Sequence, residues 1–371
     1  MERRSFLKKA GVTAGAGLLA ACSGKGVTAA AGGSNEKVEW TLASSFPKSV
    51  DAIFGSAEKF AARVKELTGG NFTIHVKAAG EVVPPLEVLG TVQNKTVQIG
   101  QSASYYYFGK DATFAFDTAI PFGLTARQHV AWMMHGGGME LMREFFKQYN
   151  IVNFLGGNTG TQMGGWYKKE IKTLADLNGL KLRTSGFAGK VMSKLGVVPQ
   201  QLPAGEIYTA LEKGTIDGVE WVGPYDDEKL GFYKVAPFYY YPGWWEGGAN
   251  LSYYVNAEEY AKLPESYKAA IAAASMEAQI EVQSKYDASN PAAMAKLLGE
   301  GAKLQKFSDE IMSAAFKATQ EACAEEAAKN PNFKKIFDSW LAFRHNEMQW
   351  FGLAERAYAE FAESHPWKPG A

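Results

Sequence analysis

Four polar side chains in the middle of the chain have the chemistry needed to hold a small anion together with a metal ion. They are Gln162, Arg183, Glu220 and Glu246, and each stands among apolar residues or glycines. A guanidinium binds a carboxylate through two parallel hydrogen bonds, which lysine cannot reproduce. Carboxylate and amide oxygens, with a nearby backbone carbonyl, suit a hard ion such as calcium or sodium and are poor ligands for zinc. The four residues therefore predict a site for an organic acid that could include an ion.

Each of these residues also has a structural explanation, which the sequence leaves open. An isolated arginine such as Arg183 is more often part of a structural salt bridge than of a binding site. Glu220 is harder to explain in this way, because it follows Ile216 and Val219 in a segment expected to be buried, where an unpaired carboxylate is strongly disfavoured. It needs a cation nearby, either an arginine or a metal. Glu246, among glycines and tryptophans, raises the same question.

The sequence motifs of enzyme catalysis are missing. No pair of the five histidines has the spacing of a zinc-binding helix, and the chain contains neither a G-x-S-x-G elbow nor a phosphate-binding Walker loop. The lone Cys323 lies in a helical run, where a packing role is expected. Glu220 and Glu246 are the only candidates for a catalytic base, and the ion site already uses them. We therefore expect a binding protein; a secreted metal-dependent enzyme acting on small organic acids is the alternative.

Strand and helix patterns alternate along the first two thirds of the chain. Predicted strands lie at 38–43, 72–76, 97–101, 151–155, 180–183, 216–221 and 250–256, with another that begins at 164–167. Predicted helices lie at 52–67, 85–93, 128–148 with a break at 136–138, 189–195 and 205–213. This alternation is typical of a parallel α/β sheet. Ligands of such sheets bind at the carboxyl ends of the strands, where Arg183, Glu220 and the loop with Gln162 are expected.

The C-terminal third has a different composition. From Ser266 to near Glu363 it is rich in Ala, Glu and Lys and predicts almost uninterrupted helix. A body containing sheets, followed by a long helical region, fits a two-lobed binding protein better than a barrel enzyme. The helical tail at 290–363 could also support a homodimer.

The N-terminus predicts export from the cytoplasm. Arg3-Arg4-Ser5-Phe6-Leu7-Lys8 has the form of a twin-arginine signal, and an apolar run follows it from Ala10 to Ala21. Leu19-Ala20-Ala21-Cys22 has the form of a lipobox, in which Cys22 would carry the lipid after cleavage. The alternative is an ordinary secretory signal with a chance cysteine. We expect a signal at 1–22, a flexible tether at 23–36 and a periplasmic protein whose only membrane attachment is the lipid on Cys22.

Composition narrows the partners. The 371 residues include 39 basic and 39 acidic side chains, so the formal charge is zero and no polybasic segment suggests nucleic-acid binding. After the signal, no apolar stretch approaches the roughly 18 residues that span a bilayer. The cysteines are Cys22 and Cys323, and with Cys22 in the lipobox no internal disulfide is expected.

One segment resembles a known family. Residues 201–218, QLPAGEIYTALEKGTIDG, are similar to the signature of solute-binding proteins of tripartite ATP-independent periplasmic (TRAP) transporters. The order of Arg183 before this segment and Glu220-Trp221 after it matches as well, and the resemblance runs from Trp40 to about Trp350. Two further segments, 164–166 and 242–248, look most like the subgroup that binds 2-oxo and 2-hydroxy monocarboxylates.

That resemblance implies a fold and a binding mode. The fold would be α/β with two lobes, joined by crossing strands and a long helix: lobe I at 37–158 plus about 250–290, and lobe II with the C-terminal helices at 159–249 plus about 291–371. Arg183 would grip the substrate carboxylate. A metal ion would bridge substrate and protein through Gln162, Glu220, the carbonyl of Trp221 and Glu246, although glutamine is the other residue expected at 246. Two carboxylates and a substrate carboxylate offset a divalent ion best, so calcium is favoured over sodium.

The resemblance also implies a function. The chain would not be an enzyme but a receptor that binds a pyruvate- or lactate-like acid and delivers it to a TRAP membrane permease. A sensor that uses the same fold without transport is an alternative. Tyr106 and Asn158 are further candidates for contact with the substrate, and Phe46, Trp166, Trp221 and Trp245 could wall an apolar pocket. The sequence does not identify the acid.

Overall fold

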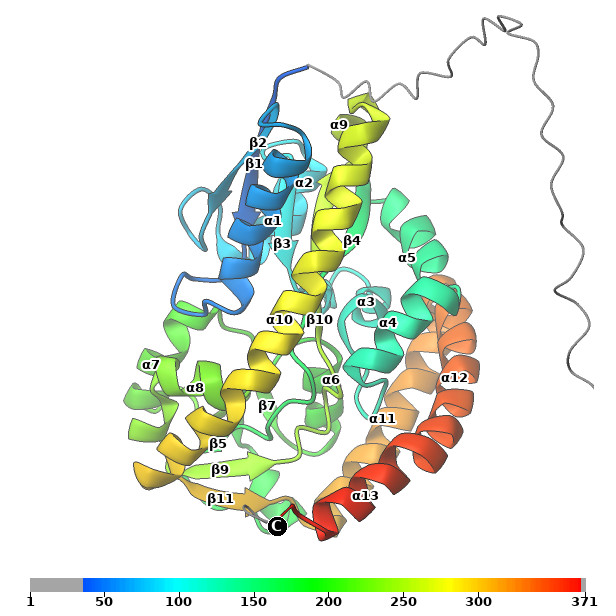
Figure 1. Ribbon diagram of the computed structural model, residues 1–371. Coiled ribbons are helices and arrows are strands. Elements are labelled where there is room, and N and C mark those ends of the chain that lie inside the picture. The colour runs from blue at the N-terminus through cyan, green and yellow to red at the C-terminus, as the bar shows by residue number, and fades with distance from the viewer. Residues whose placement is uncertain (1–35, 368–371) are drawn as a thin grey trace, which may run out of the picture. The chain divides into compact units, whose positions relative to one another are not determined.

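Two β-sheets form the body of residues 36–367, which are the residues that this computed structural model describes (Figure 1). The expected signal at 1–22, with Cys22, and residues 23–35 of the expected tether lie outside the described residues. The two sheets and the helices packed on them confirm the predicted α/β class.

The first sheet has the strand order β2-β1-β3-β10-β4. Its strands are β1 (Val38–Ser44), β2 (Phe72–Lys77), β3 (Ile99–Ser102), β4 (Ile151–Asn158) and β10 (Asn250–Asn256). The first three pair in parallel, whereas β10 runs antiparallel to both β3 and β4. The sheet is therefore mixed, and the purely parallel arrangement predicted from the alternating pattern is wrong. The reason is that β10 returns to this sheet from the other one instead of following a local strand–helix crossover.

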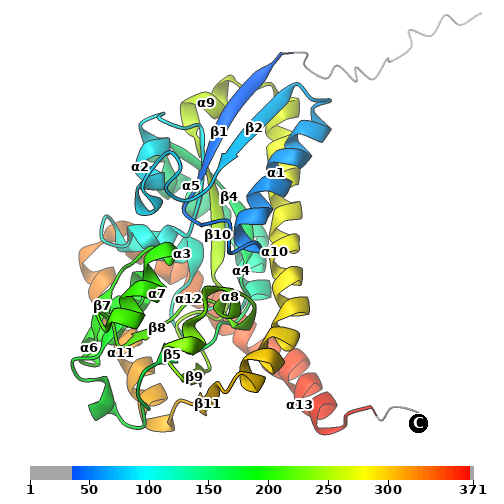
Figure 2. The same cartoon turned by 90° about the vertical axis from the view of Figure 1, so that its left-hand side faces the viewer.

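Helices cover both faces of the first sheet (Figure 2). On one face lie α1 (Ile53–Leu67) and the 35-residue α10 (Glu265–Gly299), and on the other lies α2 (Val88–Gln93). Buried side chains of the sheet, including Trp40, Phe72 and Tyr253, pack with Phe60 of α1 in one apolar cluster. The remaining helices of this region are α3 (Ala115–Thr118), α4 (Ala126–His135), α5 (Gly138–Lys147) and α9 (Ala257–Lys262). The break between α4 and α5 falls at the predicted glycines.

The second sheet has the order β11-β9-β5-β8-β6-β7. Its strands are short: β5 (Trp166–Tyr167), β6 (Lys181–Arg183), β7 (Val198–Gln200), β8 (Gly218–Val219), β9 (Phe238–Tyr241) and β11 (Lys303–Lys306). Its helices are α6 (Gly186–Lys194), α7 (Ala204–Lys213) and α8 (Pro224–Leu230). Gly165 stands at φ +81°, where a Cβ would lie 2.3 Å from the carbonyl oxygen of Val219. Only glycine lets this chain segment approach β8 so closely.

The chain crosses between the sheets three times. It passes to the second sheet after β4, returns in β10, and reaches the second sheet again through α10 and β11. Helix α10 runs along much of the molecule (Figure 1), packing on α1 and β4 and also on α8. The crossing strands and the long connecting helix are thus confirmed, while the residue boundaries assigned to the two lobes stay a prediction.

The C-terminal region consists of α11 (Asp309–Lys329), α12 (Pro331–Phe351), a π-helical turn (Gly352–Arg356) and α13 (Ala357–Ser364). The almost uninterrupted helix predicted from Ser266 is wrong at β11, which pairs with β9. Cys323 is buried in α11, and burial raises the pKa of its thiol to about 12. Within residues 36–367, no helix has the length and apolar character to cross a membrane.

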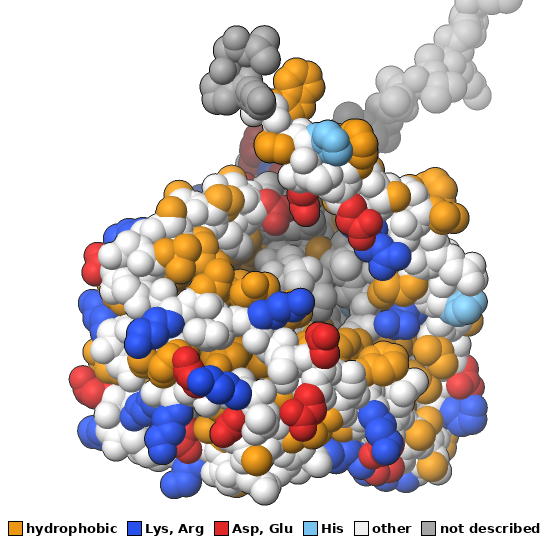
Figure 3. Space-filling model, turned by 90° about the horizontal axis from the view of Figure 1, so that it is seen from below, with side chains coloured by type: hydrophobic (Ala, Val, Ile, Leu, Met, Phe, Trp, Pro, Cys, Tyr) orange, Lys and Arg blue, Asp and Glu red, His pale blue; other side chains and the backbone are white. Residues whose placement is uncertain are grey.

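The face beneath the second sheet has a mixed charge (Figure 3). Basic and acidic side chains are interspersed there with hydrophobic ones, and neither sign covers a continuous area. This face therefore lacks the basic surface by which a protein binds nucleic acid.

Candidate functional site

A cavity lies where the connections of the two sheets meet, and it is lined from both sides. Most of its lining is apolar or aromatic, Arg183 lies at the end of β6, and Thr159 and Gln162 come from the connection that follows β4. The lining residues are Phe46, Ile53, Ala103, Tyr105, Tyr106, Thr159, Gln162, Arg183, Trp221, Val222, Ala249 and Leu251. A water-sized sphere can place its centre in only about 10 Å³ of this cavity. The site is therefore narrow and partly open to solvent.

Arg183 ends strand β6 and lies in the cavity wall with 1% of its surface exposed. Its Nη1 donates to the carbonyl oxygen of Glu220 at 2.9 Å and to Glu220 Oε1 at 2.6 Å, and its Nε donates to the carbonyl of Leu202 at 3.2 Å. The guanidinium carbon lies 4.9 Å from the centre of a Trp221 ring. The structural salt bridge that the sequence left open is thus present, in a side chain that also lines the cavity.

The ion pair changes the pKa values of both partners. Burial acts against the charged form of Arg183, but Glu220, Tyr106 and Tyr105 together outweigh it, so the pKa of Arg183 is raised. Burial raises the pKa of Glu220 to about 7, although Arg183 acts in the opposite direction. Arg183 therefore stays cationic, while burial favours the neutral form of Glu220 and the arginine opposes that effect.

Three buried oxygens near Arg183 have no hydrogen-bond partner among the described residues. They are Oε1 of Gln162, Oε2 of Glu220 and Oε2 of Glu246. Burial, and then the charge of Glu220, raise the pKa of Glu246 well above its ordinary value. Buried oxygens are normally satisfied, and a buried carboxyl whose pKa a second carboxyl raises further indicates a missing positive charge. An all-oxygen set of this kind fits a hard cation.

The fit of a metal depends on more than carboxylates. Within residues 36–367 no group of three or more His, Cys, Asp or Glu side chains is placed to hold a metal ion. The set predicted from the sequence has two carboxylates, Glu220 and Glu246, so a cation here would also need the amide of Gln162, the carbonyl of Trp221 and an oxygen of the solute.

Backbone bonds hold Gln162 and Glu246 together, although they are distant in sequence. The amide N–H of Gln162 donates to the carbonyl of Glu246 at 3.1 Å, and the N–H of Gly243 donates to the carbonyl of Gln162 at 2.9 Å. A Cβ on Gly243 would lie 2.6 Å from that carbonyl oxygen, so glycine is required for the close approach. The side chain of Gln162 donates to Thr159 Oγ1 at 3.1 Å through Nε2, which leaves Oε1 without a partner.

Trp221 is held by a residue that the sequence analysis missed. Its indole Nε1 donates to Oδ2 of Asp226 at 3.2 Å, and the hydroxyl of Tyr286 on α10 donates to the same oxygen at 2.7 Å. Asp226 is buried in α8, a helix that was not predicted. Pro224 at its first position, followed by two aspartates in the first turn, was the available signal.

The remaining predicted residues divide into two groups. Tyr106, Phe46 and Trp221 line the cavity as expected. Burial raises the pKa of Tyr106 to about 12, with Arg183 acting against that increase. Asn158 does not line it; its Oδ1 accepts from the N–H of Gly160 at 3.0 Å and so shapes the loop. A contact of Asn158 with solute stays a prediction.

Two tryptophans expected in the pocket wall are elsewhere. Trp166 stacks on Tyr239 with ring centres 3.9 Å apart, and Trp245 packs edge-on against Trp244 at 5.0 Å. Tyr105, which the sequence did not single out by itself, lines the cavity instead. Sequence position alone did not distinguish a core aromatic side chain from one in the wall.

The family follows from a match to residues 43–330, which fit the model of the DctP family, bacterial extracellular solute-binding protein family 7. The chain belongs to the DctP family. A relative from Nostoc sp. (strain PCC 7120), the monocarboxylate 2-oxoacid-binding periplasmic protein all3028, is 46% identical over 364 residues, which cover 98% of this chain and all of that protein. DctP proteins are extracytoplasmic solute-binding proteins of TRAP transporters rather than enzymes. The expectations of a TRAP solute-binding protein and of a protein that is not an enzyme are therefore confirmed.

Three solved structures of TRAP solute-binding proteins are similar throughout, and each match covers 88% of this chain. One from Bordetella bronchiseptica, a mixed-occupancy dimer with calcium and picolinate in its bound site, is 50% identical over 97% of that chain, with a TM-score of 0.87. One from Colwellia psychrerythraea, with calcium and pyruvate, is 39% identical over its full length, with a TM-score of 0.86. One from Pseudoalteromonas atlantica, with sodium and pyruvate, is 40% identical over 99% of that chain, with a TM-score of 0.85.

Proposed function

We propose that this DctP protein is a receptor for a small 2-oxo acid, of which pyruvate is the simplest, and that it delivers the acid to a TRAP membrane permease. The observation that carries the proposal is the group of three unpartnered buried oxygens, of Gln162, Glu220 and Glu246, together with a narrow cavity that Gln162 and Arg183 line. The Nostoc relative named for 2-oxoacid binding, and the two similar structures with pyruvate, support the same solute class.

Arg183 would hold the carboxylate of the acid. Its bonds to Glu220 and Leu202 use Nη1 and Nε, so Nη2 is the nitrogen that we assign to the solute. Trp221 at the guanidinium face and the bond from Nε to Leu202 fix the orientation of the planar guanidinium. The Tyr106 hydroxyl, which faces the same charge and is protonated near neutral pH, would donate a hydrogen bond to the acid.

A cation would neutralise the acidic side of the cavity. Gln162, Glu220, the carbonyl of Trp221 and Glu246 would hold it, and it would supply positive charge to oxygens of a 2-oxo acid. Calcium is the ion that we propose, because two carboxylates in one small site balance the charge of a divalent ion better than that of a monovalent ion. Among the similar structures, two contain calcium and one contains sodium.

The narrow cavity sets the size of the solute. The free space in the cavity has room for about one water molecule, so a large acid can enter only if the side chains move apart. Acids of a few carbons can occupy the cavity after modest shifts of Tyr105, Tyr106 and Phe46. We therefore infer that release requires the lobes to separate along the crossing segments, with lobe I at 37–158 plus about 250–290 and lobe II at 159–249 plus about 291–371.

We further propose that the chain is exported through its twin-arginine signal and retained by a lipid on Cys22. Support comes from the sequence at 3–8 and from the lipobox at 19–22, both outside the described residues. Metabolic labelling with a radioactive fatty acid tests the anchor. Label on the wild type that disappears in the Cys22→Ala variant is expected, and an unlabelled wild type would contradict it.

A homodimer through the C-terminal helices is the oligomeric state that we propose. Four large apolar side chains of α12, the π-helical turn and α13 are exposed: Trp350, Leu353, Tyr358 and Phe361. Helix α13 projects away from the neighbouring helices (Figure 2). An apolar surface of this kind marks a protein interface, and the similar Bordetella structure is a dimer.

Thermal melting against a panel of small carboxylates tests the proposed solute class. A solute far above its dissociation constant raises the free energy of unfolding by a few kcal/mol, which corresponds to a shift of several degrees. We expect pyruvate and other short 2-oxo acids to raise the melting temperature in calcium buffer, and dicarboxylates or sugars to have no effect. A panel in which no 2-oxo acid shifts the transition would contradict the proposal.

A further inference from the structure

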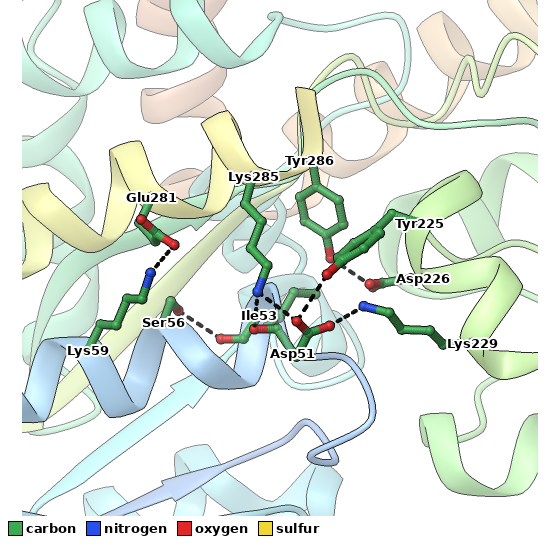
Figure 4. Close-up of polar contacts among 10 residues, drawn as sticks. All are labelled: Asp51, Ile53, Ser56, Lys59, Tyr225, Asp226, Lys229, Glu281, Lys285 and Tyr286. Atoms are coloured by element: carbon green, nitrogen blue, oxygen red, sulfur yellow. Dashed lines mark hydrogen bonds and ion pairs between the residues drawn. The ribbon is translucent and has the colours of Figure 1, made fainter. Parts of the chain in front are cut away.

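A cluster of charged and phenolic side chains joins the two walls of the cavity (Figure 4). Asp51 is its centre and lies between β1 and α1, in the segment that also brings Phe46 and Ile53 to the cavity. The carboxylate of Asp51 forms an ion pair with Lys229 through Oδ1 and with Lys285 through Oδ2, the second at 2.6 Å. Asp51, between Phe46 and Ile53 of the cavity lining, is thus held by two cations from other helices.

The partners of Asp51 lie on α8 and on the long helix α10. Tyr225, whose hydroxyl donates to Asp51 Oδ2 at 3.0 Å, and Lys229 lie on α8. Helix α8 begins shortly after Trp221 and Val222, which line the cavity together with Phe46. Because Trp221 is also bonded to Asp226 of α8, we expect a movement of this segment away from Phe46 to strain the contact between α8 and Asp51.

Helices α8 and α10 act as one support for this contact. The N–H of Tyr225 donates to Oδ1 of Asn290 on α10 at 3.1 Å, and Tyr286 of α10 donates to Asp226 of α8. Lys285, the second cation on Asp51, also belongs to α10. The three donors to Asp51 are therefore fixed relative to one another before they meet it.

The cluster is stronger than a single surface ion pair. Isolated exposed pairs contribute little. Here three donors share one carboxylate, the Lys229 ammonium lies 3.2 Å from the centre of the Tyr225 ring, and both lysine side chains are less than a third exposed. Burial acts against the charge of Asp51, and the bonds from Lys229 and Lys285 outweigh it, lowering its pKa to about 2.

We propose that Asp51 is a positioning residue for solute retention: its bonds to Tyr225 and Lys229 of α8 join the two proposed lobes and set the rate at which the bound acid leaves. The inference rests on the proposed function of the cavity as a solute site. Asp51 touches no solute in this account. It acts by favouring the state in which Phe46 and Trp221 lie on either side of the acid.

Other ion pairs of the same region provide matched controls. Lys48 and Glu81 pair at 2.8 Å within the connections of the first sheet, and Arg63 of α1 pairs with Glu277 of α10 at 2.9 Å. Neither pair involves α8. Removing one of them changes the surface charge as Asp51→Asn does, but leaves the contact between the two walls intact.

Stopped-flow tryptophan fluorescence with pyruvate and calcium measures the two rate constants separately. For Asp51→Asn we expect the dissociation rate to rise about tenfold, equivalent to ~1.4 kcal/mol, with the association rate changed less than about threefold. Lys229→Met should have a similar effect, and the double variant should dissociate little faster than Asp51→Asn alone, because both changes break one contact. Glu81→Gln should match the wild type.

Two results would overturn the proposal. One is a dissociation rate for Asp51→Asn within twofold of that of Glu81→Gln; the other is a double variant whose two effects multiply in full. If the wild type binds no 2-oxo acid, the proposed function fails, and the contact is then tested without solute by small-angle X-ray scattering. A larger radius of gyration for Asp51→Asn than for the wild type and Glu81→Gln would support it, and equal radii would overturn it.

Discussion

Glu220 binds Arg183 through only one of its two carboxylate oxygens. Oε1 accepts from Nη1 at 2.6 Å, while Oε2 has no hydrogen-bond partner among the described residues although the side chain is buried. A carboxylate held in this way has one oxygen committed to positioning the arginine and one available to a cation. The pair therefore explains how a structural salt bridge and a binding site can use the same two residues.

Replacement of Arg183 by lysine should abolish most of the solute affinity. Lysine keeps the positive charge but lacks the planar fork, so the bonds to Glu220, Leu202 and the acid cannot all be made. We expect the dissociation constant for pyruvate to rise at least tenfold, measured by calorimetry with calcium present. Arg63→Lys, at an exposed ion pair, is the control and should bind normally. Near-normal affinity in Arg183→Lys, with the fold verified by its melting temperature, would refute the assigned role.

Replacement of Glu246 by glutamine should separate stability from ion binding. Without a cation the buried carboxyl is unfavourable, since burial and Glu220 raise its pKa, so the glutamine variant should melt at a higher temperature than the wild type in chelator. Calcium should then raise the melting temperature of the variant much less than that of the wild type, because one anionic ligand is missing.

The control for this variant is Glu326→Gln, which removes a buried carboxyl that pairs with Lys190 on α6, outside the cavity lining. It should keep the full calcium response. An unchanged calcium response in Glu246→Gln would show that this residue is not a ligand of the ion.

The stability of the protein should depend on pH through Asp227. This buried side chain accepts from Tyr239 and Trp166, and burial raises its pKa to about 7 from the ordinary 3.8. A raised pKa means that the folded state holds the proton more tightly. The contribution of Asp227 is therefore complete below about pH 4 and is lost as the pH rises through 7.

Asp227→Asn resembles the protonated form and should remove this loss. We expect the difference in melting temperature, Asp227→Asn minus wild type, to increase from pH 5 to pH 8. Asp338→Asn, at an exposed pair with Lys334, should follow the wild type at both pH values. A pH-independent difference between Asp227→Asn and the wild type would contradict the assigned protonation.

A charge on the apolar face of α13 should disrupt the proposed dimer. In Phe361→Glu an exposed aromatic side chain is replaced by a carboxylate that would be buried at the interface. Sedimentation should then show a monomer at concentrations where the wild type is a dimer, with solute binding unchanged. Val82→Glu, at an exposed apolar residue of the first sheet's connections, should remain a dimer. A monomeric wild type would exclude the dimer.

The sequence predicted the local elements well where one pattern dominated. Strand β10 was placed at its observed bounds, and the helix predicted at 205–213 corresponds to α7, which is followed by Gly214 at φ +75°. Strands β7, β9 and β11 were missed because they are short and their pairing partners lie far away in the sequence. Strand direction was also beyond the local pattern, since the antiparallel pairing of β10 depends on where the chain returns from the second sheet.

The site could be predicted only in part. Arg183 and Glu220 were brought together by the parallel pairing of β6 and β8, which places their strand ends side by side. The contact between Asp51 and Lys229 could not be foreseen, because it joins a loop of one sheet to an unpredicted helix of the other. Likewise Trp166 and Trp245 are core residues, and no feature of their neighbours in the sequence separates them from Trp221.

The measurement that tests the central claim most directly is a calorimetric titration of pyruvate into protein from which metal ions have been removed, repeated after calcium has been restored. If Gln162, Glu220 and Glu246 hold a cation that completes the site with Arg183, pyruvate should bind once per chain with calcium and at least tenfold more weakly without it. Equal affinity in the two titrations would contradict the account, because the three unpartnered oxygens would then serve some purpose other than binding an ion together with the acid.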